Sequence, residues 1–371
     1  MTKIPSIYFQ PSIYKENKLY CALPTNGDAD LAFTRASEAT RVNQNGLIET
    51  VGVNVPRLDH SDGGCPSLLV EPQSTNLVTY SENFSNAVWV KTDASVTSNS
   101  DVAPDGTTTA DTITADANNV TIQQFYTGVI GTDYTTSFYI KRKTGTGVVS
   151  IRSVENVTTP ITVTNEWTRV SLTTTSTTTT IRIGINLATS GDEVYVWGAQ
   201  LEQQSYATSY IPTVAGTVTR VEETCSKNGL NSYINTQEGV LFLEAKVPIT
   251  TKQKDFMITN GGVSDVVGFN FSDYRILSIC RIGTVTQASI ESTIDAGFMK
   301  LAFQWQQNNF SLYKNGVKIG EDLLGSVGSV GLFDTLSFNR GSFNDFQGEL
   351  KQFSVYDSVL TEAELITLTT L

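Results

Sequence analysis

Histidine is the scarcest reactive residue in this chain of 371 residues, because it occurs once, as His60. His60 lies in the loop-like run LDHSDGGC, so a Ser-His-Asp or Cys-His arrangement would have to be built around it. The sequence has no G-x-S-x-G turn to expose a nucleophilic serine, and a zinc site with several imidazole ligands fails for lack of histidine. A lone loop histidine is more often a surface residue, so the sequence does not favour nucleophilic catalysis.

Basic charge is also scarce. The chain has 25 Lys and Arg against 37 Asp and Glu, which gives a net charge of −12 and a pI near 4.6. Its one basic run, Lys141-Arg142-Lys143, falls at the end of an expected strand and is typical of a solvated turn edge. Binding to nucleic acid depends on a concentrated basic face, so we exclude nucleic acid as a partner.

Long apolar runs are missing as well. No window reaches the roughly 18 apolar residues of a membrane-spanning helix, so we expect no membrane insertion. The first residues, MTKIPSIYFQPSIYK, contain no uninterrupted apolar run, so we expect no secretory signal and synthesis in a cytoplasm.

Cysteine pairs and acidic metal loops are equally sparse. The four cysteines form no C-x-x-C motif, which favours reduced, mostly packed thiols and leaves a disulfide open as the minority alternative. Asp28 and Asp30 have a D-x-D spacing that could hold Ca²⁺, but the later Glu of a full loop site is absent. A solvated turn is the favoured interpretation, and we expect no cofactor, with Ca²⁺ left possible.

Thr, Ser, Asn and Gly are abundant, and short stretches alternate between apolar and polar residues. We therefore predict an all-β protein with two β-sandwich (jelly-roll) domains in tandem, after a β-rich N-terminal attachment region. The expected divisions are an attachment segment at 1–32, a β-rich collar at 33–80, a first sandwich at 81–212, a connector at 213–238 and a second sandwich at 239–371.

Several local signals are sharper. Asn43-Gln44-Asn45-Gly46 predicts a short hairpin turn, and Asn315-Gly316 predicts a type I′ turn. The apolar phase changes between Leu350 and Phe353, which predicts a β-bulge, and Thr361 to Glu364 reads as a capping box that opens a short terminal helix. The threonine-rich run 173–180 is expected to form one exposed hairpin arm.

Phe33–Leu77 is the most specific stretch. Its text, FTRAS-x-ATR-x-x-x-x-GLIE followed by LLVEPQSTNL, resembles a segment of bacteriophage virion proteins, mostly tail-fibre, head-fibre or spike components. The resemblance implies a protein of the virion surface, made in the host cytoplasm, that binds host glycans for adsorption. It also implies contacts with other virion proteins through the N-terminal region and assembly as a homotrimer.

Both predicted sandwiches carry resemblances of their own. NEWTRVSL and VYVWGAQLE…SYIPT resemble carbohydrate-binding jelly-roll modules, while LAFQW…FSLYKNG and GELKQFSVYDSVLTEAE resemble laminin-G or concanavalin-A-like lectin domains. Sugar binding needs an aromatic platform and polar groups that fix hydroxyls. The candidates of the first sandwich are Trp89, Tyr134, Tyr139, Trp197 and Gln200, and those of the second are Tyr274, Arg275, Arg340 and Asn344.

Competing interpretations stay open for these aromatic residues. Trp167 and Trp305 lie on alternating apolar phases and are expected to be core residues. Trp197 is more readily explained as capping the sandwich edge, whereas Trp89 lies beside polar loop residues and is the preferred platform.

Two other functions also remain. The protein could be a purely structural decoration or adaptor of the capsid or tail, since fold does not establish function. It could also be a polysaccharide depolymerase, because glycoside hydrolysis needs two carboxylates and no histidine. The carboxylate candidates are Asp192, Glu193, Glu202, Glu244 and Asp273. Since no E-x-D-x-x-E run is present, we expect a protein that is not an enzyme.

Overall fold

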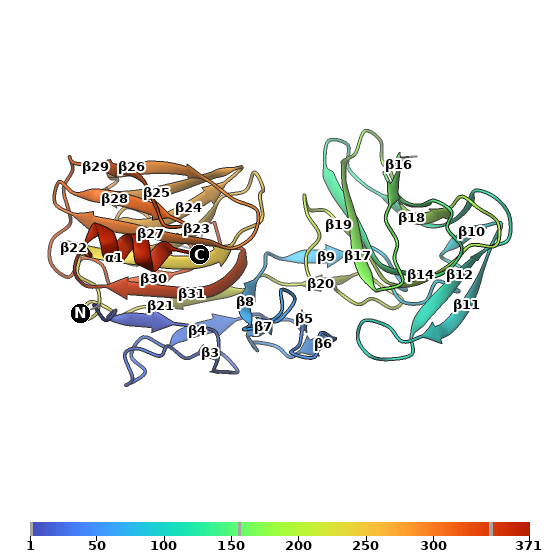
Figure 1. Cartoon of the computed structure of the whole chain (residues 1–371), viewed down its shortest axis with the longest axis horizontal. Helices are drawn as coiled ribbons and strands as arrows, with labels where there is room; N and C mark the ends of the chain where they lie inside the picture. Colours follow the sequence, from blue (N-terminus) through green and yellow to red (C-terminus); the bar gives the residue numbers. More distant parts are fainter. Residues whose placement is uncertain (1–2, 155–156, 341–343) are drawn as a thin grey trace. The chain divides into compact units, whose positions relative to one another are not determined.

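The computed structural model of this chain describes residues 3–154, 157–340 and 344–371. In these ranges the chain forms β-strands and one short helix, arranged in two compact units (Figure 1). Unit 1 comprises Met1–Ala36, Val51–Pro72 and Glu222–Leu371, and unit 2 comprises Ser37–Thr50 and Gln73–Val221. The predicted all-β class, with two β-sandwiches and a short C-terminal helix, is confirmed.

Unit 1 is a sandwich of two antiparallel sheets. The first has the strand order β29-β28-β27-β22-β31-β8-β7, with β1 also paired to β31. It contains β1 (Ile7–Phe9), β7 (Arg57–Asp59), β8 (Ser67–Val70), β22 (Glu238–Lys246), β27 (Met299–Gln306), β28 (Phe310–Lys314), β29 (Val317–Asp322) and β31 (Gly348–Tyr356).

The second sheet of unit 1 has the order β2-β3-β4-β21-β30-β23-β24-β25-β26. It contains β2 (Tyr14–Lys15), β3 (Lys18–Leu19), β4 (Leu31–Thr34), β21 (Thr224–Lys227), β23 (Lys254–Thr259), β24 (Val266–Ser272), β25 (Arg275–Ile282), β26 (Val285–Thr293) and β30 (Thr335–Ser337). Leu241 and Phe353 of the first sheet share one apolar core with Phe256 and Phe271 of the second.

The N-terminal residues contribute strands to this sandwich. Ile7 pairs with Val355, and Phe33 pairs with Cys225. Ile7 and Phe33 are both 0 % exposed. The predicted divisions at 32, 80, 212 and 238 therefore do not match the units, because strands far apart in sequence complete the same sheets. Figure 1 shows the blue N-terminal strands beside the yellow and red C-terminal strands of unit 1.

Unit 2 is a second antiparallel sandwich. One sheet has the order β10-β13-β18-β15-β16 and the other β11-β12-β19-β14-β17. The first contains β10 (Val90–Thr92), β13 (Val120–Thr127), β15 (Val149–Ser153), β16 (Val157–Ile161) and β18 (Thr180–Leu187). The second contains β11 (Ala94–Asp101), β12 (Ala110–Ala115), β14 (Asp133–Thr144), β17 (Thr168–Thr175) and β19 (Glu193–Glu202). Small two-stranded pairs add β5 (Ala39–Val42) with β6 (Ile48–Val51) and β9 (Ser74–Asn76) with β20 (Val218–Arg220).

The threonine-rich run does not form a hairpin arm, so that prediction is wrong. Its first half belongs to β17, which pairs with β14, and its end opens β18, which pairs with β13 and β15. The run therefore connects the two sheets of unit 2. Threonine favours extended backbone, but the residue type alone does not determine which strand becomes its partner.

The sharp local signals are confirmed. Gly46 has φ +76° in the turn between β5 and β6, and Asn315 and Gly316 both have positive φ between β28 and β29, as a type I′ turn requires. In β31, Gln352 pairs with Glu244 and Leu350 with Ala245, so Lys351 is the additional residue of the predicted bulge.

The terminal helix α1 (Glu362–Thr369) begins with the predicted capping box. The Thr361 side chain accepts a hydrogen bond from the Glu364 N–H, and the Glu364 carboxylate accepts one from the Thr361 N–H at 2.8 Å. Leu365 packs with Phe242 and Tyr313, so the helix covers part of the outer face of the first sheet. No helix in the described ranges has the length and apolarity needed to cross a membrane.

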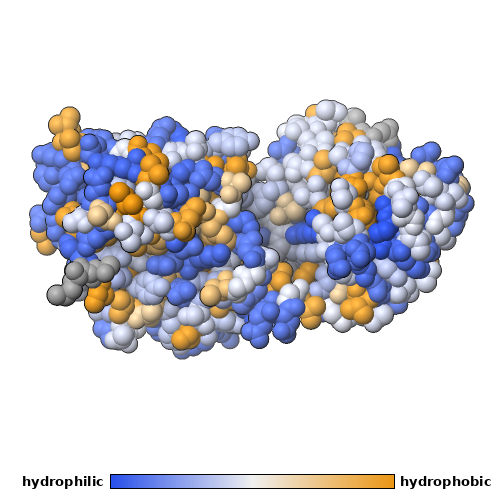
Figure 2. Space-filling view, viewed as in Figure 1, coloured by the Kyte–Doolittle hydropathy of each residue, from blue (hydrophilic) through white to orange (hydrophobic). Residues whose placement is uncertain are grey.

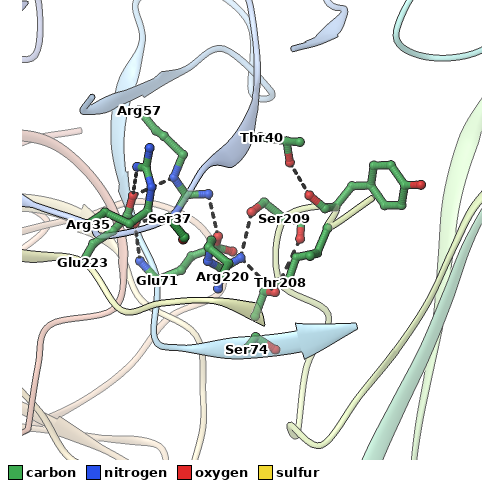
Figure 3. A network of polar contacts seen from close by, with 12 residues as sticks. Arg35, Ser37, Thr40, Arg57, Glu71, Ser74, Thr208, Ser209, Arg220 and Glu223 are labelled. Carbon is green, nitrogen blue, oxygen red and sulfur yellow. Dashed lines mark hydrogen bonds and ion pairs between the residues drawn. The ribbon is translucent and has the colours of Figure 1, made fainter. Parts of the chain in front are cut away.

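Buried charges of the Phe33–Leu77 stretch hold unit 1 together. Arg35 and Arg57 converge on the Glu223 carboxylate, and Arg57 also binds Glu71 at 2.7 Å (Figure 3). Burial opposes the charge of Arg57, but Glu223 and Glu71 outweigh it and raise the pKa of this guanidinium. The two Arg and two Glu balance in charge. Arg35, Arg57 and Glu71 of this stretch are thus buried ion-pair residues that stabilise unit 1.

The four cysteines are free thiols, and three of them are buried: Cys21, Cys225 and Cys280. Burial raises the pKa of Cys21 and of Cys280 to about 12. Protonated, packed thiols match the prediction for a chain without cysteine motifs.

Candidate functional site: a polar cleft in unit 2

Hydrophobic residues on the face shown in Figure 2 lie among hydrophilic ones in both units and do not merge into one band. A cleft of about 400 Å³, lined mostly by residues of polar type, is present in unit 2. Its lining consists of Tyr80, Glu82, Asn83, Ser98, Asn99, Thr109, Asp111, Thr213 and Val214.

One wall of the cleft is a bulge between β11 and β12. Thr97 pairs with Thr112 and Asp101 with Ala110, so residues 98–100 all lie opposite Asp111. Asn99 adopts φ +51°, a left-handed conformation that Asn tolerates better than most residues. The bulge brings the exposed side chains of Ser98 and Asn99 to the rim of the cleft.

Asp111 fastens this bulge to the neighbouring loop. Its Oδ1 accepts a hydrogen bond from the Asn99 N–H at 2.9 Å, and its Oδ2 accepts one from the Phe84 N–H at 2.8 Å. Burial raises the pKa of this carboxyl, although the backbone donors oppose the shift. Both oxygens are committed to the backbone, so Asp111 shapes the cleft.

Glu82 is the half-buried acid of the cleft. Its Oε1 accepts a hydrogen bond from the Tyr210 hydroxyl at 2.8 Å. Burial raises the pKa of Glu82, the Tyr210 bond opposes the rise, and the nearby Asp105 adds to it. A carboxylate held from behind in this way can accept hydrogen bonds from ligand hydroxyls on its open side.

Three predicted sugar-binding residues lie behind the cleft. Trp197 is buried, packs on Tyr210 with a centroid distance of 4.5 Å and donates its Nε1–H to Thr109 Oγ1 at 3.1 Å. Tyr139 packs on Trp197 at 5.6 Å. The Gln200 side chain accepts from the Ile211 N–H at 2.7 Å and donates to the carbonyl oxygens of residues 208 and 209. These residues support the segment that presents Tyr210 to Glu82.

The other two candidates of this domain are core residues. Trp89 is 1 % exposed, lies 4.7 Å from the Phe84 ring and donates its Nε1–H to the Tyr80 carbonyl at 3.1 Å. Tyr134 is also buried, and its hydroxyl accepts the Val129 N–H at 2.9 Å. Neither ring presents a face to solvent, because each packs between the two sheets.

The expected core role is confirmed for Trp305, which is fully buried. Trp167 is partly buried against the cluster around Trp197, and its Nε1–H donates to the Val102 carbonyl at 2.9 Å.

The candidates of unit 1 form two different pairs. Tyr274 is 69 % exposed, and its neighbour Arg275 binds Glu291 at 3.0 Å on the surface. Arg340 and Asn344 instead meet the buried Asp255, at 3.5 Å and 3.0 Å. Burial raises the pKa of Asp255, while Asn270, Arg340 and Asn344 oppose the rise.

Metal-type clusters of three or more His, Cys, Asp or Glu do not occur among the residues that the structure describes. The Asp30 carboxylate contacts Lys18 at 2.6 Å and the Cys21 N–H at 2.9 Å, and Asp28 accepts the Tyr233 hydroxyl at 2.7 Å. Both D-x-D acids are therefore engaged by protein donors.

The acids considered for hydrolysis are mostly engaged too. Asp192 binds Arg142 at 3.2 Å, and Glu193 accepts the Thr114 hydroxyl at 2.9 Å. Glu202 is buried and accepts the Ser74 hydroxyl at 2.7 Å. Glu244 is half-buried on β22 and Asp273 is exposed in the turn after β24, both in unit 1. His60 lies 3.3 Å from the Gly64 carbonyl in a surface loop.

Sequence reasoning missed Tyr80, Glu82, Ser98 and Asn99. The polar run T-S-N-S-D near the end of β11 was the available signal, because it interrupts the alternation of that strand. The run forms a wall of the cleft because residues 98–100 lie opposite Asp111, and this position follows only from the pairing of β11 with β12.

No family model matches the sequence, and no curated protein matches it. Similar solved structures include the carbohydrate-binding module of a Ruminococcus gnavus IT-sialidase bound to sialyllactose, with 16 % identity and a TM-score of 0.32 over 36 % of this chain and 83 % of that chain. A leech intramolecular trans-sialidase has 17 % identity and a TM-score of 0.32 over 37 % of this chain and 24 % of that chain.

A putative carbohydrate-binding protein from Bacteroides ovatus has 12 % identity and a TM-score of 0.28 over 69 % of this chain and 81 % of that chain. All three TM-scores are low, so no property of these proteins is transferred to this chain.

Proposed function

We propose that this protein binds glycans through the cleft of unit 2. The observation that carries the proposal is the lining itself, where a half-buried Tyr80 stands beside the Glu82 carboxylate, the Asn83 and Asn99 amides and the Ser98 hydroxyl. Sugars present hydroxyls that both donate and accept hydrogen bonds, together with small apolar ring faces. The cleft volume of about 400 Å³ falls in the ordinary range of small-ligand sites.

The charge of the cleft narrows the ligand class. Glu82 and Asp111 are its two acidic lining residues, and none of the described residues that line it is Lys, Arg or His. An anionic sugar would meet repulsion at Glu82, whereas a neutral sugar can donate hydroxyl hydrogens to it. Neutral glycans are therefore the favoured ligands.

We place this activity on a bacteriophage particle, as part of a tail fibre, head fibre or spike that adsorbs to the host. Support comes from the resemblance of Phe33–Leu77 to virion proteins. Residues 7–34 contain strands β1 to β4 of unit 1, so attachment to other virion proteins would use the surface of that unit. Assembly as a homotrimer would raise a weak single-site affinity by multivalent display.

A glycan array tests the binding activity. Ser98→Tyr fills the rim of the cleft, and within residues 3–154, 157–340 and 344–371 the exposed Ser98 side chain makes no hydrogen bond. Thr97→Tyr is the matched control, because Thr97 is exposed on the same strand but does not line the cleft. We expect wild type and Thr97→Tyr to bind the same neutral glycans and Ser98→Tyr to lose them. Silence of the wild type on a dense array would overturn the proposal.

A separate measurement addresses the particle. Antibodies against the chain should label the virions whose genome encodes it, and free chain should compete with those virions for host cells. Labelling of the particle without such competition would favour the structural decoration role instead.

A further inference from the structure

Asn-Gly pairs recur along the chain, and the cleft of unit 2 contains none of them. In such a pair the side-chain amide carbon lies close to the backbone nitrogen of the next residue, and glycine has no Cβ to block the approach. That nitrogen can therefore attack the amide unless the fold holds one of the two groups. The five pairs are Asn26-Gly27, Asn45-Gly46, Asn228-Gly229, Asn260-Gly261 and Asn315-Gly316.

The glycine N–H is bonded to a protein acceptor in four of the five pairs. The donors and acceptors are Gly27 with the Pro24 carbonyl at 3.4 Å, Gly46 with the Asn43 carbonyl at 2.9 Å, Gly261 with Thr259 Oγ1 at 2.9 Å and Gly316 with Thr369 Oγ1 at 3.2 Å. An N–H that is bonded in this way is harder to deprotonate and is held away from the amide. These four nitrogens are therefore poor nucleophiles.

The asparagine amide is also held in three of these four pairs. The Nδ2 groups donate to carboxylates: Asn26 to Asp28 at 2.7 Å, Asn260 to Asp265 at 2.7 Å and Asn315 to Asp295 at 3.0 Å. Asn45 is the exception, because its exposed side chain makes no hydrogen bond within the described ranges. Protection of that pair rests on the Gly46 N–H alone.

Asn228-Gly229 differs from the other pairs at both groups. Across residues 3–154, 157–340 and 344–371, neither the Asn228 side chain nor the Gly229 N–H makes a hydrogen bond, and both residues are exposed. A Cβ atom at Gly229 would meet no atom within 4 Å, so the space around the pair is open. The pair follows the end of β21 and precedes Leu230, which is fully buried and donates its N–H to the Asp334 carbonyl at 2.7 Å.

We propose that Asn228 is a site of spontaneous deamidation in the folded protein and the fastest of the five Asn-Gly pairs. Hydroxide removes the Gly229 amide proton, and the nitrogen attacks Asn228 Cγ. A new C–N bond closes a succinimide ring, the Cγ–Nδ2 bond breaks, and ammonia leaves after taking up a proton from water. Water then opens the ring at either carbonyl and gives aspartate or isoaspartate.

The product changes unit 1 in two ways. Each form carries one additional carboxylate, so the net charge becomes more negative by one. Isoaspartate also adds a methylene group to the main chain between β21 and the anchored Leu230. This reaction marks the age of the protein, and it does not depend on glycan binding.

Mass spectrometry of the ageing full chain tests the assignment. Peptides that cover each pair are quantified over time at mildly alkaline pH, in the folded chain and in the same chain unfolded in urea. The ratio of the two rates cancels the influence of neighbouring sequence. We expect Asn228 in the folded chain to react within about twofold of its unfolded rate, and each of the other four pairs at least about fivefold more slowly than in urea, because their hydrogen bonds must open first.

Asn228→Gln supplies the matched variant, since glutamine closes the larger imide ring much more slowly. It should abolish the first acidic form that anion-exchange chromatography separates from aged protein. Asn260→Gln is the control, because Asn260 is exposed in unit 1 and its pair is hydrogen-bonded. It should leave that acidic form unchanged.

Three results would overturn the proposal. They are protection of Asn228 equal to that of the other pairs, faster reaction of another pair in the folded chain, and persistence of the first acidic form in Asn228→Gln. A glycan array without binding leaves these measurements unaffected, so the two proposals fail separately.

Discussion

Arg57 donates its Nε–H to Glu223 Oε1 at 2.8 Å, with both side chains fully enclosed in unit 1. The same oxygen accepts a hydrogen bond from Arg35 Nη1 at 2.7 Å, and the Glu71 N–H donates to Oε2 at 2.9 Å. One carboxylate thus joins residues 35, 57 and 71 of the N-terminal third to the start of the C-terminal segment of unit 1, Glu222–Leu371. Arg35, Arg57 and Glu71, which all belong to the Phe33–Leu77 stretch, therefore lie where these two parts of unit 1 meet.

Glu223→Gln should therefore be among the most damaging single substitutions. It leaves two buried guanidinium groups with one fewer counter-charge, and breaking a buried pair typically costs about 3–5 kcal/mol. Urea unfolding should show this loss for Glu223→Gln and almost none for the exposed neighbour Glu222→Gln. A loss below about 1 kcal/mol would mean that the network contributes little.

Asp111→Ala should damage both stability and binding. The Asn99 and Phe84 N–H groups lose their acceptor, at a cost of about 1–3 kcal/mol, and the bulge is no longer tied to the loop. Glycan affinity should fall along with the melting temperature. Asp116→Ala is the control, since that exposed acid only accepts the Ser95 hydroxyl. Unchanged glycan affinity in Asp111→Ala would show that the Asp111 hydrogen bonds to Asn99 and Phe84 are not needed for binding.

Glu82→Gln should change the pH dependence of stability. Burial raises the pKa of folded Glu82 above the ordinary 4.5, so its stabilising, protonated form is favoured below that pH and is lost as pH rises through the raised pKa. Glutamine imitates the protonated acid and still accepts the Tyr210 hydroxyl. The variant should melt roughly 1–2 °C above wild type at neutral pH and level with it near pH 4. A difference in melting temperature between Glu82→Gln and wild type that does not change with pH would contradict the raised pKa of Glu82.

Lys254→Met tests a buried base of unit 1. Lys254 is 0 % exposed, and burial lowers its pKa from 10.5 to about 8. Between these values the folded state is neutral while the unfolded state is protonated, so wild-type stability should rise with pH across this window. Lys254→Met should lack that rise, and the exposed Lys252→Met should keep it. Parallel pH profiles for wild type and Lys254→Met would refute the shift.

The local features were predictable because each is decided by neighbours in sequence. Gly46, Asn315-Gly316, the added Lys351 and the Thr361 cap all follow from backbone preference or strand alternation over a few residues. The sequence did not predict that the N-terminal strands belong to the sandwich of unit 1, because β1 pairs with β31, which follows more than 300 residues later. The burial of Trp89 and the cleft at Asp111 depend on the same kind of distant pairing.

The most direct test of the account is a crystal structure of the chain with the strongest neutral glycan from the array. We predict a sugar in the unit 2 cleft, with a hydroxyl within hydrogen-bond distance of Glu82 and another beside Asn99. A well-ordered sugar elsewhere on the protein, with this cleft filled only by solvent, would contradict the central claim.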